Sequence, residues 1–446
     1  MTLPEDFIRE TRLLMGDARF DRFIGAFDEE APTSIRINRR KVDGGNHNSP
    51  LGSPLATEGT QEFSILNSQF EKVPWCPEGF YLSGRPQFTF DPLFHAGCYY
   101  VQEAASMFIT HVLRSLSNLI PHSSFLIPRN VLDLCAAPGG KSTAMRTVLP
   151  EGSVLVSNEP IPTRAQILLE NITKWGWPDC IVTNNYPRDF RKAKMTFDLI
   201  LCDVPCSGEG MFRKDPATIS EWSLQNVEKC WRLQREIVAD AWECLNPGGL
   251  LIYSTCTYNI KENEENIRWI LETYDAEALA IPTDPSWNIT GSLLPGFDVP
   301  VYRFIPGITR SEGLFMCILR KFGGTEVRGY GGARYDYRQI KGLSILVPPF
   351  PRTPVPPTID LSYPDALRYL RGEALILPPD TPRGIVTVTY RGIPLGPVKN
   401  IGPRANNLYP KPWRIKTTHL PSTPVEIICT LATEKTQEPE NVNRKL

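Results

Sequence analysis

The sequence predicts a doubly wound α/β domain, preceded by a small α/β domain and followed by a small β-rich domain. From residue 131 onward, short apolar runs alternate with longer helical patterns, which is typical of βα units and a parallel sheet. After Arg320 the chain becomes rich in glycine and proline before short β-type runs appear. A chain of 446 residues is also too long for one ordinary domain.

The first domain is expected over residues 1–94. Within it, LPEDFIRETRLLM (3–15) predicts a helix and SIRINRRKV (34–42) predicts a strand. Residues 44–69 are rich in Gly, Ser, Asn and Pro without periodicity, so we interpret them as a mobile loop.

The central domain is expected over residues 95–323, with one parallel sheet. Its predicted strands are VLDLC (131–135), SVLVSNE (153–159), CIVTNN (180–185), FDLILCD (197–203) and GLLIYSTC (249–256). Helical patterns follow the first two strands, and a long apolar stripe over residues 222–245 predicts a helix before the last one. In such folds the ligand binds outside the carboxyl ends of the strands.

The rest of the chain divides into three parts. The proline-rich stretch around VPPFPRTPVPPTID predicts a linker over residues 324–360. Short β-type runs such as GIVTVTYRG and VEIICTLA predict the third domain over residues 361–432, and residues 433–446 are expected to be disordered.

Composition indicates a soluble globular protein, with 41% hydrophobic and 22% charged residues. The chain begins with acidic residues where a secretory signal is basic, and it has no run of about 18 apolar residues, so we expect a cytoplasmic protein that does not enter a membrane. An odd number of cysteines, eleven, indicates reduced thiols. No C-x-x-C occurs and the five histidines are not at ligand spacing, so no metal site is expected.

A glycine-containing loop, DLCAAPGGKS (133–142), joins the first predicted strand to its helix. Gly139 and Gly140 allow close approach of the backbone to a ligand, and the helix start offers free N–H groups to a carboxylate or phosphate. The loop is neither a Walker loop nor a G-x-G-x-x-G loop, and a simple tight turn is the alternative. Glu159 ends the second strand, where it is either solvated or able to accept ribose hydroxyls; loop and acid together favour a nucleoside ligand.

Three motifs in this order, DLCAAPGGKS, FDLILCDVPCSGEGMFRKDP and LLIYSTCTYNIKENEENI, resemble the Fmu/Sun family of RNA cytosine methyltransferases, which use S-adenosylmethionine. The N-terminal LPEDF and IRINRRK and the segment HAGCYYVQEAASM (95–107) are also similar to that family. The stretches LRYLRGEAL, VTYRGIPLGPVKN and NNLYPK resemble the C-terminal extension of bacterial RsmF-type members, which modify small-subunit ribosomal RNA. The resemblance implies a class I, Rossmann-like methyltransferase core between an RNA-binding N-terminal domain and a PUA-like C-terminal domain.

The chemistry of this family explains its cysteines. Carbon 5 of cytosine is a poor nucleophile until a thiolate adds to carbon 6. By resemblance, Cys256 is the nucleophile and Cys206 assists release of the methylated base. DNA cytosine methyltransferases instead attack with the cysteine of a Pro-Cys pair, which is Cys206 here, so both assignments stay open. A small buried hydrophobic role is the alternative for any cysteine, but both stand in polar, turn-forming contexts.

The resemblance also implies further site residues. Asp203 is either a turn residue or a ligand of the cofactor or the cytosine amine, and Lys141 is either solvated or directed at the cofactor or base. The expected cofactor contacts are Cys135, Ala136, Ala137, Pro138, Gly139, Gly140, Lys141, Glu159, Asn185 and Asp203. Two positions depart from the family pattern. Asn185 or Tyr186 stands where an aspartate often meets adenine, and Gly307 stands where a histidine often follows the proline.

The expected partner is RNA, most specifically small-subunit ribosomal RNA. Between residues 381 and 425 there are seven basic residues and no acidic ones, interleaved with Tyr390, Tyr409 and Trp413, which suits phosphate contact and base stacking. An ordinary basic surface is the alternative. Arg213 and Lys214 are a second candidate RNA contact, or the start of a helix. Transfer RNA as substrate and a non-catalytic role in ribosome assembly remain the alternative functions, and a monomer is expected.

Overall fold

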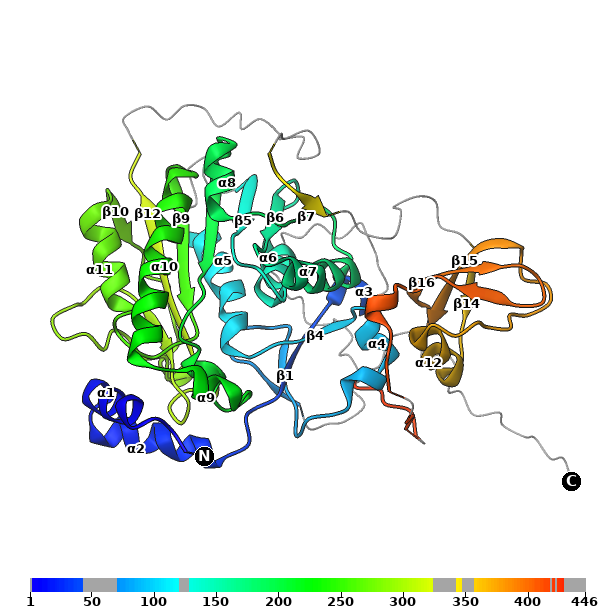
Figure 1. Ribbon diagram of the computed structural model, residues 1–446, viewed down its shortest axis with the longest axis horizontal. Helices are drawn as coiled ribbons and strands as arrows, with labels where there is room; N and C mark the ends of the chain where they lie inside the picture. The colour runs from blue at the N-terminus through cyan, green and yellow to red at the C-terminus, as the bar shows by residue number, and fades with distance from the viewer. Residues whose placement is uncertain are drawn as a thin grey trace, which may run out of the picture.

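The computed structural model describes residues 2–42, 70–119, 128–323, 342–346, 357–417, 419–421 and 423–428. They form a four-stranded sheet, a nine-stranded sheet and a second four-stranded sheet in chain order (Figure 1). The predicted loop over 44–69, the larger part of the predicted linker and the tail over 433–446 lie outside the described residues. Within the described ranges, no helix is both long and apolar enough to cross a membrane.

The N-terminal unit begins with two helices, α1 (Glu5–Met15) and α2 (Asp17–Gly25). Its sheet has the order β2 (Glu71–Lys72), β3 (Gly79–Tyr81), β1 (Ser34–Ile37) and β4 (Tyr99–Val101). The predicted strand over 34–42 ends at Ile37, and its RRKV continues as the short helix α3 (Arg39–Val42). Because β4 pairs with β1, the sheet extends beyond the expected domain boundary at residue 94.

The central unit confirms the predicted doubly wound α/β fold. All five predicted strands are present and parallel to one another: β5 (Asn130–Asp133), β6 (Val154–Asn158), β7 (Cys180–Thr183), β8 (Phe197–Asp203) and β9 (Leu245–Thr255). Four antiparallel strands extend the sheet: β10 (Ala276–Ala278), β11 (Tyr302–Phe304), β12 (Leu314–Lys321) and β13 (Ile345–Leu346). The main path runs β10-β12-β9-β8-β5-β6-β7-β13.

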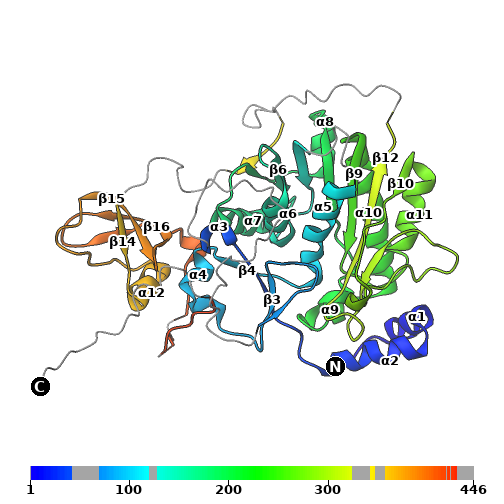
Figure 2. The same cartoon turned by 180° about the vertical axis from the view of Figure 1, so that it is seen from behind.

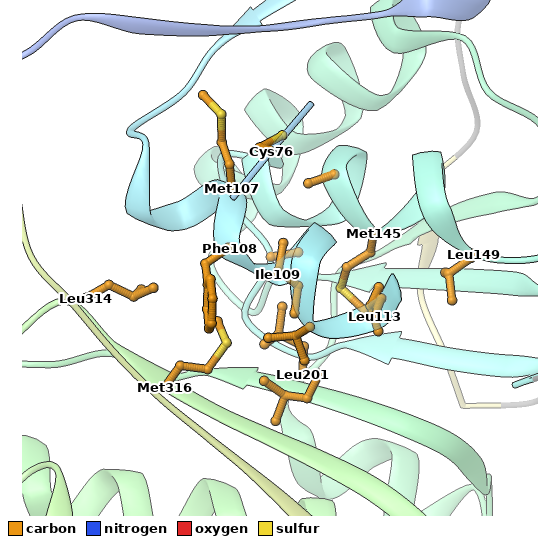
Figure 3. Close-up of a cluster of buried hydrophobic side chains, with 14 of the residues drawn as sticks. Cys76, Met107, Phe108, Ile109, Leu113, Met145, Leu149, Leu201, Leu314 and Met316 are labelled. Carbon is orange, nitrogen blue, oxygen red and sulfur yellow. The ribbon is translucent and has the colours of Figure 1, made fainter. Parts of the chain in front are cut away.

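Helices cover both faces of this sheet (Figures 1 and 2). Successive strand residues point to opposite faces, so Leu201 packs with α5–α7 whereas Ile200 packs with α8, α10 and α11. Figure 3 shows the first of these cores around Phe108 and Met145. The bounds are α5 (Phe108–Leu119), α6 (Gly140–Val148), α7 (Pro162–Trp175), α8 (Pro187–Lys192), α9 (Ala217–Glu221), α10 (Leu224–Glu243) and α11 (Glu264–Thr273).

The C-terminal unit has the strand order β14 (Thr358–Asp360), β15 (Gly384–Tyr390), β16 (Ile393–Asn400) and β17 (Ala405–Asn407), with helix α12 (Tyr363–Arg371). It shares one apolar core with the N-terminal unit, in which Leu93 of α4 (Pro92–His95) and Tyr99 join Leu367 and Val386. The predicted strand over 425–432 is not formed in its described residues, 425–428.

Candidate active site

Two thiols meet at the carboxyl edge of the central sheet. Strands β8 and β9 are parallel neighbours with Asp203 opposite Ser254, so the loops that follow them leave the sheet side by side. The Sγ atoms of Cys206 and Cys256 lie 3.3 Å apart, and both residues are half-buried. The structure therefore brings together the two cysteines that the sequence singled out.

A glycine allows the two loops to approach this closely. The Gly210 N–H donates to the Cys256 carbonyl oxygen at 2.8 Å, which ties one cysteine loop directly to the other. A Cβ atom at Gly210 would lie 2.3 Å from the same oxygen, closer than nonbonded atoms can come. A side chain at this position would therefore push the loops apart.

The surroundings of Cys206 shift its pKa. The hydrogen bond with Cys256 raises the pKa of Cys206 well above its ordinary value, and burial and the nearby charges of Cys256 and Glu262 raise it further. Cys206 is therefore a neutral thiol at physiological pH. A neutral thiol can donate a proton to its neighbour, whereas a thiolate is the nucleophile.

Lys141 and Asp203 form an ion pair beside the thiols. Lys141 Nζ donates to Asp203 Oδ2 at 2.8 Å. Burial lowers the pKa of Lys141, but the charge of Asp203 and its hydrogen bond outweigh burial and raise the pKa above its ordinary value. The cation is thus retained close to Cys256, whose charge also favours it.

The predicted cofactor loop runs from Asp133 at the end of β5 into α6. Gly139 has φ 112°, in the left-handed region that glycine tolerates, and Gly140 begins the helix. The loop carbonyls are held from outside, because Arg164 donates to Ala137 O at 2.9 Å and the Asn171 amide donates to Pro138 O at 2.8 Å. Three further residues of the loop are buried: Cys135, Ala136 and Ala137.

Two buried carboxylate oxygens next to this loop accept no hydrogen bond: Asp133 Oδ1 and Glu159 Oε2, the second of which has an ion-pair contact with Arg164 at 3.6 Å. The other oxygen of each is used, since Ser142 donates to Asp133 at 2.6 Å and the Ile161 N–H donates to Glu159 at 3.1 Å. Burial raises the pKa of Asp133 to about 7. Buried acceptors are normally satisfied, so these two oxygens fit a ligand that brings donors, such as the hydroxyl and amino groups of a nucleoside.

Asn185 is placed differently from the expectation. Its amide donates to Ser344 O at 3.1 Å and accepts from Ser344 N at 2.9 Å, so both polar atoms of the side chain are engaged in holding β13 against β7. The neighbouring Tyr186 is 56% exposed, with the Arg188 guanidinium 5.1 Å from its ring. Of the two candidates, Tyr186 is the one whose side chain is open.

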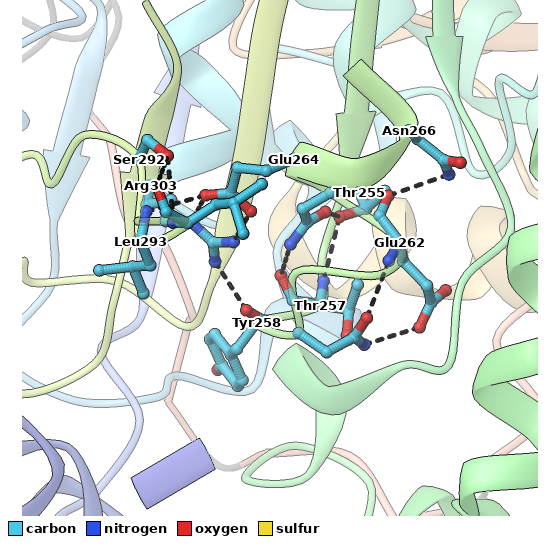
Figure 4. Close-up of polar contacts among 12 residues, drawn as sticks. Thr255, Thr257, Tyr258, Glu262, Glu264, Asn266, Ser292, Leu293 and Arg303 are labelled. Carbon is cyan, nitrogen blue, oxygen red and sulfur yellow. Dashed lines mark hydrogen bonds and ion pairs between the residues drawn. The ribbon is translucent and has the colours of Figure 1, made fainter. Parts of the chain in front are cut away.

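The sequence did not predict the buried polar network between the end of β9 and the start of α11 (Figure 4). Glu264 and Arg303 form a fully buried ion pair, and Arg303 donates to Tyr258 O at 2.7 Å. Thr255 donates to Asn263 Oδ1 at 2.6 Å, which ties the end of β9 to the start of α11. The only signal was the run of polar residues in YNIKENEENI, which is equally typical of a solvated helix start.

Several predicted RNA contacts are internal. Arg213 is paired with Glu312 at 3.0 Å, with only 7% of its side chain exposed, whereas Lys214 is exposed. In the C-terminal unit the three interleaved aromatic residues belong to the apolar core, so they are not free to stack on bases: Tyr390, Tyr409 and Trp413.

Five of the seven basic residues in that region are exposed: Arg383, Lys399, Arg404, Lys411 and Lys416. Arg391 is instead paired with Glu426 at 2.6 Å, and Arg414 donates to Tyr409 O at 3.2 Å. The structure also explains why position 307 is a glycine, because a Cβ atom there would lie 2.2 Å from Arg22 O. No group of three or more metal-ligating side chains gathers among the residues described.

Fold and site together define a Rossmann-like methyltransferase core with two adjacent cysteines. Residues 125–320 match the family of 16S rRNA methyltransferase RsmB/F. Residues 3–104 match the N-terminal domain of 16S rRNA methyltransferase RsmF, and residues 356–415 match the methyltransferase RsmF PUA domain.

Curated relatives agree with these matches. Ribosomal RNA small subunit methyltransferase F of Salmonella agona is 32% identical over 355 residues, which are 77% of this chain and 69% of that protein. The protein of the same name from Serratia proteamaculans is 32% identical over 329 residues, 72% of this chain and 63% of that protein. The chain belongs to the RsmF family, whose cofactor is S-adenosylmethionine. It spans just under two thirds of the length of the first relatives it matches, 63% and 64%.

Solved structures show the same fold. A methyltransferase homolog protein from Pyrococcus horikoshii has a TM-score of 0.53 and 25% identity, covering 72% of this chain and 100% of that one. NSun6 from the same organism, solved with SFG, has a TM-score of 0.53 and 21% identity, covering 72% of this chain and 99% of that one.

Proposed function

We propose that the protein methylates carbon 5 of a cytosine in small-subunit ribosomal RNA through a covalent adduct with Cys256. The observation that carries this proposal is the 3.3 Å contact between Cys206 Sγ and Cys256 Sγ at the edge of the sheet where a nucleoside cofactor fits. A reaction that adds a thiolate to a ring and later removes it needs a nucleophile and a proton-transfer group in contact.

The two thiols divide the work in this mechanism. The Cys256 thiolate adds to carbon 6 of cytosine, which makes carbon 5 nucleophilic. S-adenosylmethionine, when bound, supplies the electrophilic methyl group. Release requires loss of the carbon 5 proton and cleavage of the bond between sulfur and carbon 6. Cys206 is neutral and in contact with Cys256, so its proton can pass to the departing sulfur, and the Cys206 thiolate formed in this way can take the proton from carbon 5, which leaves both cysteines as thiols.

Lys141 and Asp203 support the charge changes of the base. Asp203 is about 30% exposed at its side chain, so one face of the carboxylate is open to accept a hydrogen bond from the cytosine amine. The Lys141 ammonium favours a thiolate at Cys256 by its charge. Asp203 ends β8 and Lys141 lies in the first turn of α6, so the pair stands between the thiol loop and the cofactor loop.

The cofactor would be held by the residues around its loop. Glu159 is the candidate acceptor for the ribose hydroxyls, because its buried Oε2 accepts no hydrogen bond and has only an ion-pair contact with Arg164 at 3.6 Å. The backbone of Gly139 and Gly140 at the start of α6 suits the carboxylate of the methionine part. The same loop also contains Cys135, Ala136, Ala137 and Pro138.

On the RNA side, the target cytosine has to leave its stack to reach Cys256, which is least costly in single-stranded or loop RNA. The exposed basic residues of the PUA unit supply phosphate contacts, and the family match of that unit supports RNA binding. The N-terminal unit shares its core with the PUA unit, so the two would present one combined surface to the RNA.

Adduct trapping tests this division of roles. Cys206→Ala should form a covalent complex with small-subunit RNA in the presence of S-adenosylmethionine, because attack is intact and release is slow. Cys256→Ala should form no complex and no product. The complex is read as a shifted band on a denaturing gel that disappears after ribonuclease treatment. A Cys256→Ala protein that forms the adduct through Cys206 would reverse the assignment.

A further inference from the structure

Two buried carboxylates connect the cysteine loops below the thiols. Glu209 follows Cys206 by three residues in the loop after β8, and Glu262 follows Cys256 by six residues in the loop after β9. Glu209 is 2% exposed and Glu262 is fully buried. Neither is assigned a contact with the base or the cofactor above, although the charge of Glu262 contributes to the raised pKa of Cys206. Neither forms an ion pair with a lysine or arginine within the described residues.

The bonds of these acids are reciprocal. Glu262 Oε2 accepts from the N–H of Ser207, the residue directly after Cys206, at 3.0 Å. Glu209 Oε2 accepts from the N–H groups of Tyr258 and Asn259, the second and third residues after Cys256, at 2.6 and 3.1 Å. Each loop therefore supplies a carboxylate that holds the backbone just beyond the cysteine of the other loop.

Asn259 joins the two acids. Its amide donates to Glu209 Oε1 at 2.9 Å and to Glu262 Oε1 at 2.8 Å. Trp222 Nε1 and Gln234 Nε2 complete the set, donating to Glu209 at 3.0 Å and to Glu262 at 2.6 Å.

Burying the two carboxylates is unfavourable for the free energy of folding, so stability does not explain their presence. Removing carboxylates from water without a cation costs free energy that hydrogen bonds only partly offset. Burial, together with the charge of Glu209, raises the pKa of Glu262 to about 7, which records this cost. An apolar packing of the same space would stabilise the fold at least as well, so the pair fits a positional role.

We propose that Glu209 and Glu262 are positioning residues that set the distance and alignment of Cys206 and Cys256. The clamp, defined as Glu209, Glu262 and Asn259, keeps the two sulfur atoms in contact while RNA enters. Its importance for methyl transfer rests on the proposed function, but its geometric effect on the thiols does not.

The thiols themselves report this geometry. A small-molecule disulfide is attacked by one cysteine, giving a mixed disulfide and a free thiolate. The second cysteine then displaces the remaining thiol and closes a Cys206–Cys256 disulfide, so two protein thiols are oxidised and the reagent is reduced to two thiols. The rate of the closing step depends on how well the two sulfur atoms are aligned. Mass spectrometry of the linked peptides measures the rate of disulfide closure in the absence of RNA.

The test compares Glu209→Gln and Glu262→Gln with the wild type. At both positions the neighbours donate, so an amide in place of a carboxylate brings a donor against donors. We expect disulfide closure and single-turnover methyl transfer each to slow by about tenfold or more. The dissociation constant for S-adenosylmethionine should stay unchanged, since neither acid contacts the cofactor loop.

Asp91→Asn is the matched control. Asp91 is another buried carboxyl group, in the N-terminal unit. It accepts from Tyr99 Oη at 2.7 Å and Leu93 N at 2.9 Å, and it has no hydrogen bond to either cysteine loop among the described residues. The Asp91→Asn substitution should lower the melting temperature without slowing disulfide closure. A rise in melting temperature on addition of S-adenosylmethionine shows that a variant is folded. If a Gln variant shows no such rise, Glu209→Asp or Glu262→Asp replaces it, and the same outcomes are compared.

The outcomes separate the two proposals. Wild-type closure rates in both clamp variants would overturn the clamp, whatever happens to methyl transfer. Slow closure in the clamp variants, with no methyl transfer by the wild type on any RNA, would support the clamp and remove the proposed function. Slow closure in Asp91→Asn as well would show that general loosening moves the thiols, and it would also overturn the clamp.

Discussion

At the scale of residues, the site depends on two thiols that share a hydrogen bond but have different surroundings. Cys206 is kept protonated by Cys256, by burial and by Glu262. Cys256 interacts by charge with the Lys141 ammonium, which donates to Asp203. This difference supports the proposal that Cys256 is the nucleophile and Cys206 the proton donor, the roles that the family resemblance implies.

Loss of the Lys141 charge should reduce methyl transfer. In Lys141→Gln the amide can still bond to Asp203, but no cation favours a thiolate at Cys256. We expect kcat to fall by about 10²-fold, the size found when one electrostatic contact at a reacting centre is removed. Single-turnover rates of methyl transfer measure this effect. An unchanged rate would show that Lys141 does not act on the thiol.

Asp91 should make stability depend on pH. Burial raises its pKa to about 7, while the unfolded value is about 3.9. The folded protein therefore binds this proton more tightly, and the stabilisation is complete below about pH 4 and is lost as pH rises to about 7. Asp91→Asn removes the effect, so its free energy of unfolding relative to wild type should rise by up to about 1.4 kcal/mol per pH unit over that interval. Denaturant titrations at several pH values measure this, and parallel curves for both proteins would contradict it.

Sequence patterns identified single residues where they stand next to a predicted strand end, as with Cys206, Asp203 and Cys256. They missed Glu209 and Glu262 because each bonds to a residue about fifty positions away, and only the folded chain brings the partners together. Arg213 was misjudged for the same reason, since its partner Glu312 lies 99 residues further on.

At the scale of elements, close approach of the loops after β8 and β9 sets the site. The strands were predictable because their apolar runs are buried on both faces of a parallel sheet. The short strand β13 was not, because it lies in a proline-rich stretch and is held by Asn185 and by pairing with β7. The helix α3 also replaced part of a predicted strand, because Asn38 turns inward to donate to Gly97 O and Trp175 O at 2.9 Å.

Gly210→Ala should separate the loops. The new Cβ would collide with Cys256 O, so the loops must move apart, and activity should fall by about 10²-fold. Gly208→Ala is the control in the same loop: it has φ 78° but nothing within 4 Å of its Cβ position, so it should cost only about 1 kcal/mol of stability. Initial rates and melting temperatures distinguish the two. Equal activities would show that the close approach at Gly210 is not needed.

At the scale of the whole molecule, the first and last units of the chain pack on each other through one core. This arrangement explains why the aromatic residues of the C-terminal unit are buried: they hold that unit to the N-terminal sheet. Composition and charge predicted a basic RNA-binding unit, but they could not tell core aromatics from stacking platforms, because both are flanked by the same residue types.

Substitutions in the C-terminal unit should therefore separate stability from RNA binding. Trp413→Ala should destabilise the protein by about 3–5 kcal/mol through loss of core packing. Lys399→Gln and Arg404→Gln should leave the melting temperature unchanged, weaken RNA binding and lower the slope of log K against log salt by about 1 each if each contacts a phosphate. A stable Trp413→Ala protein with weakened RNA binding would restore the stacking interpretation.

Transfer of labelled methyl from S-adenosylmethionine to unmodified small ribosomal subunits tests the central claim most directly, with naked ribosomal RNA and bulk transfer RNA alongside. We expect label in subunit RNA that is recovered as 5-methylcytidine after digestion, and no label with Cys256→Ala. Label recovered in another nucleoside, or full activity of Cys256→Ala, would contradict it.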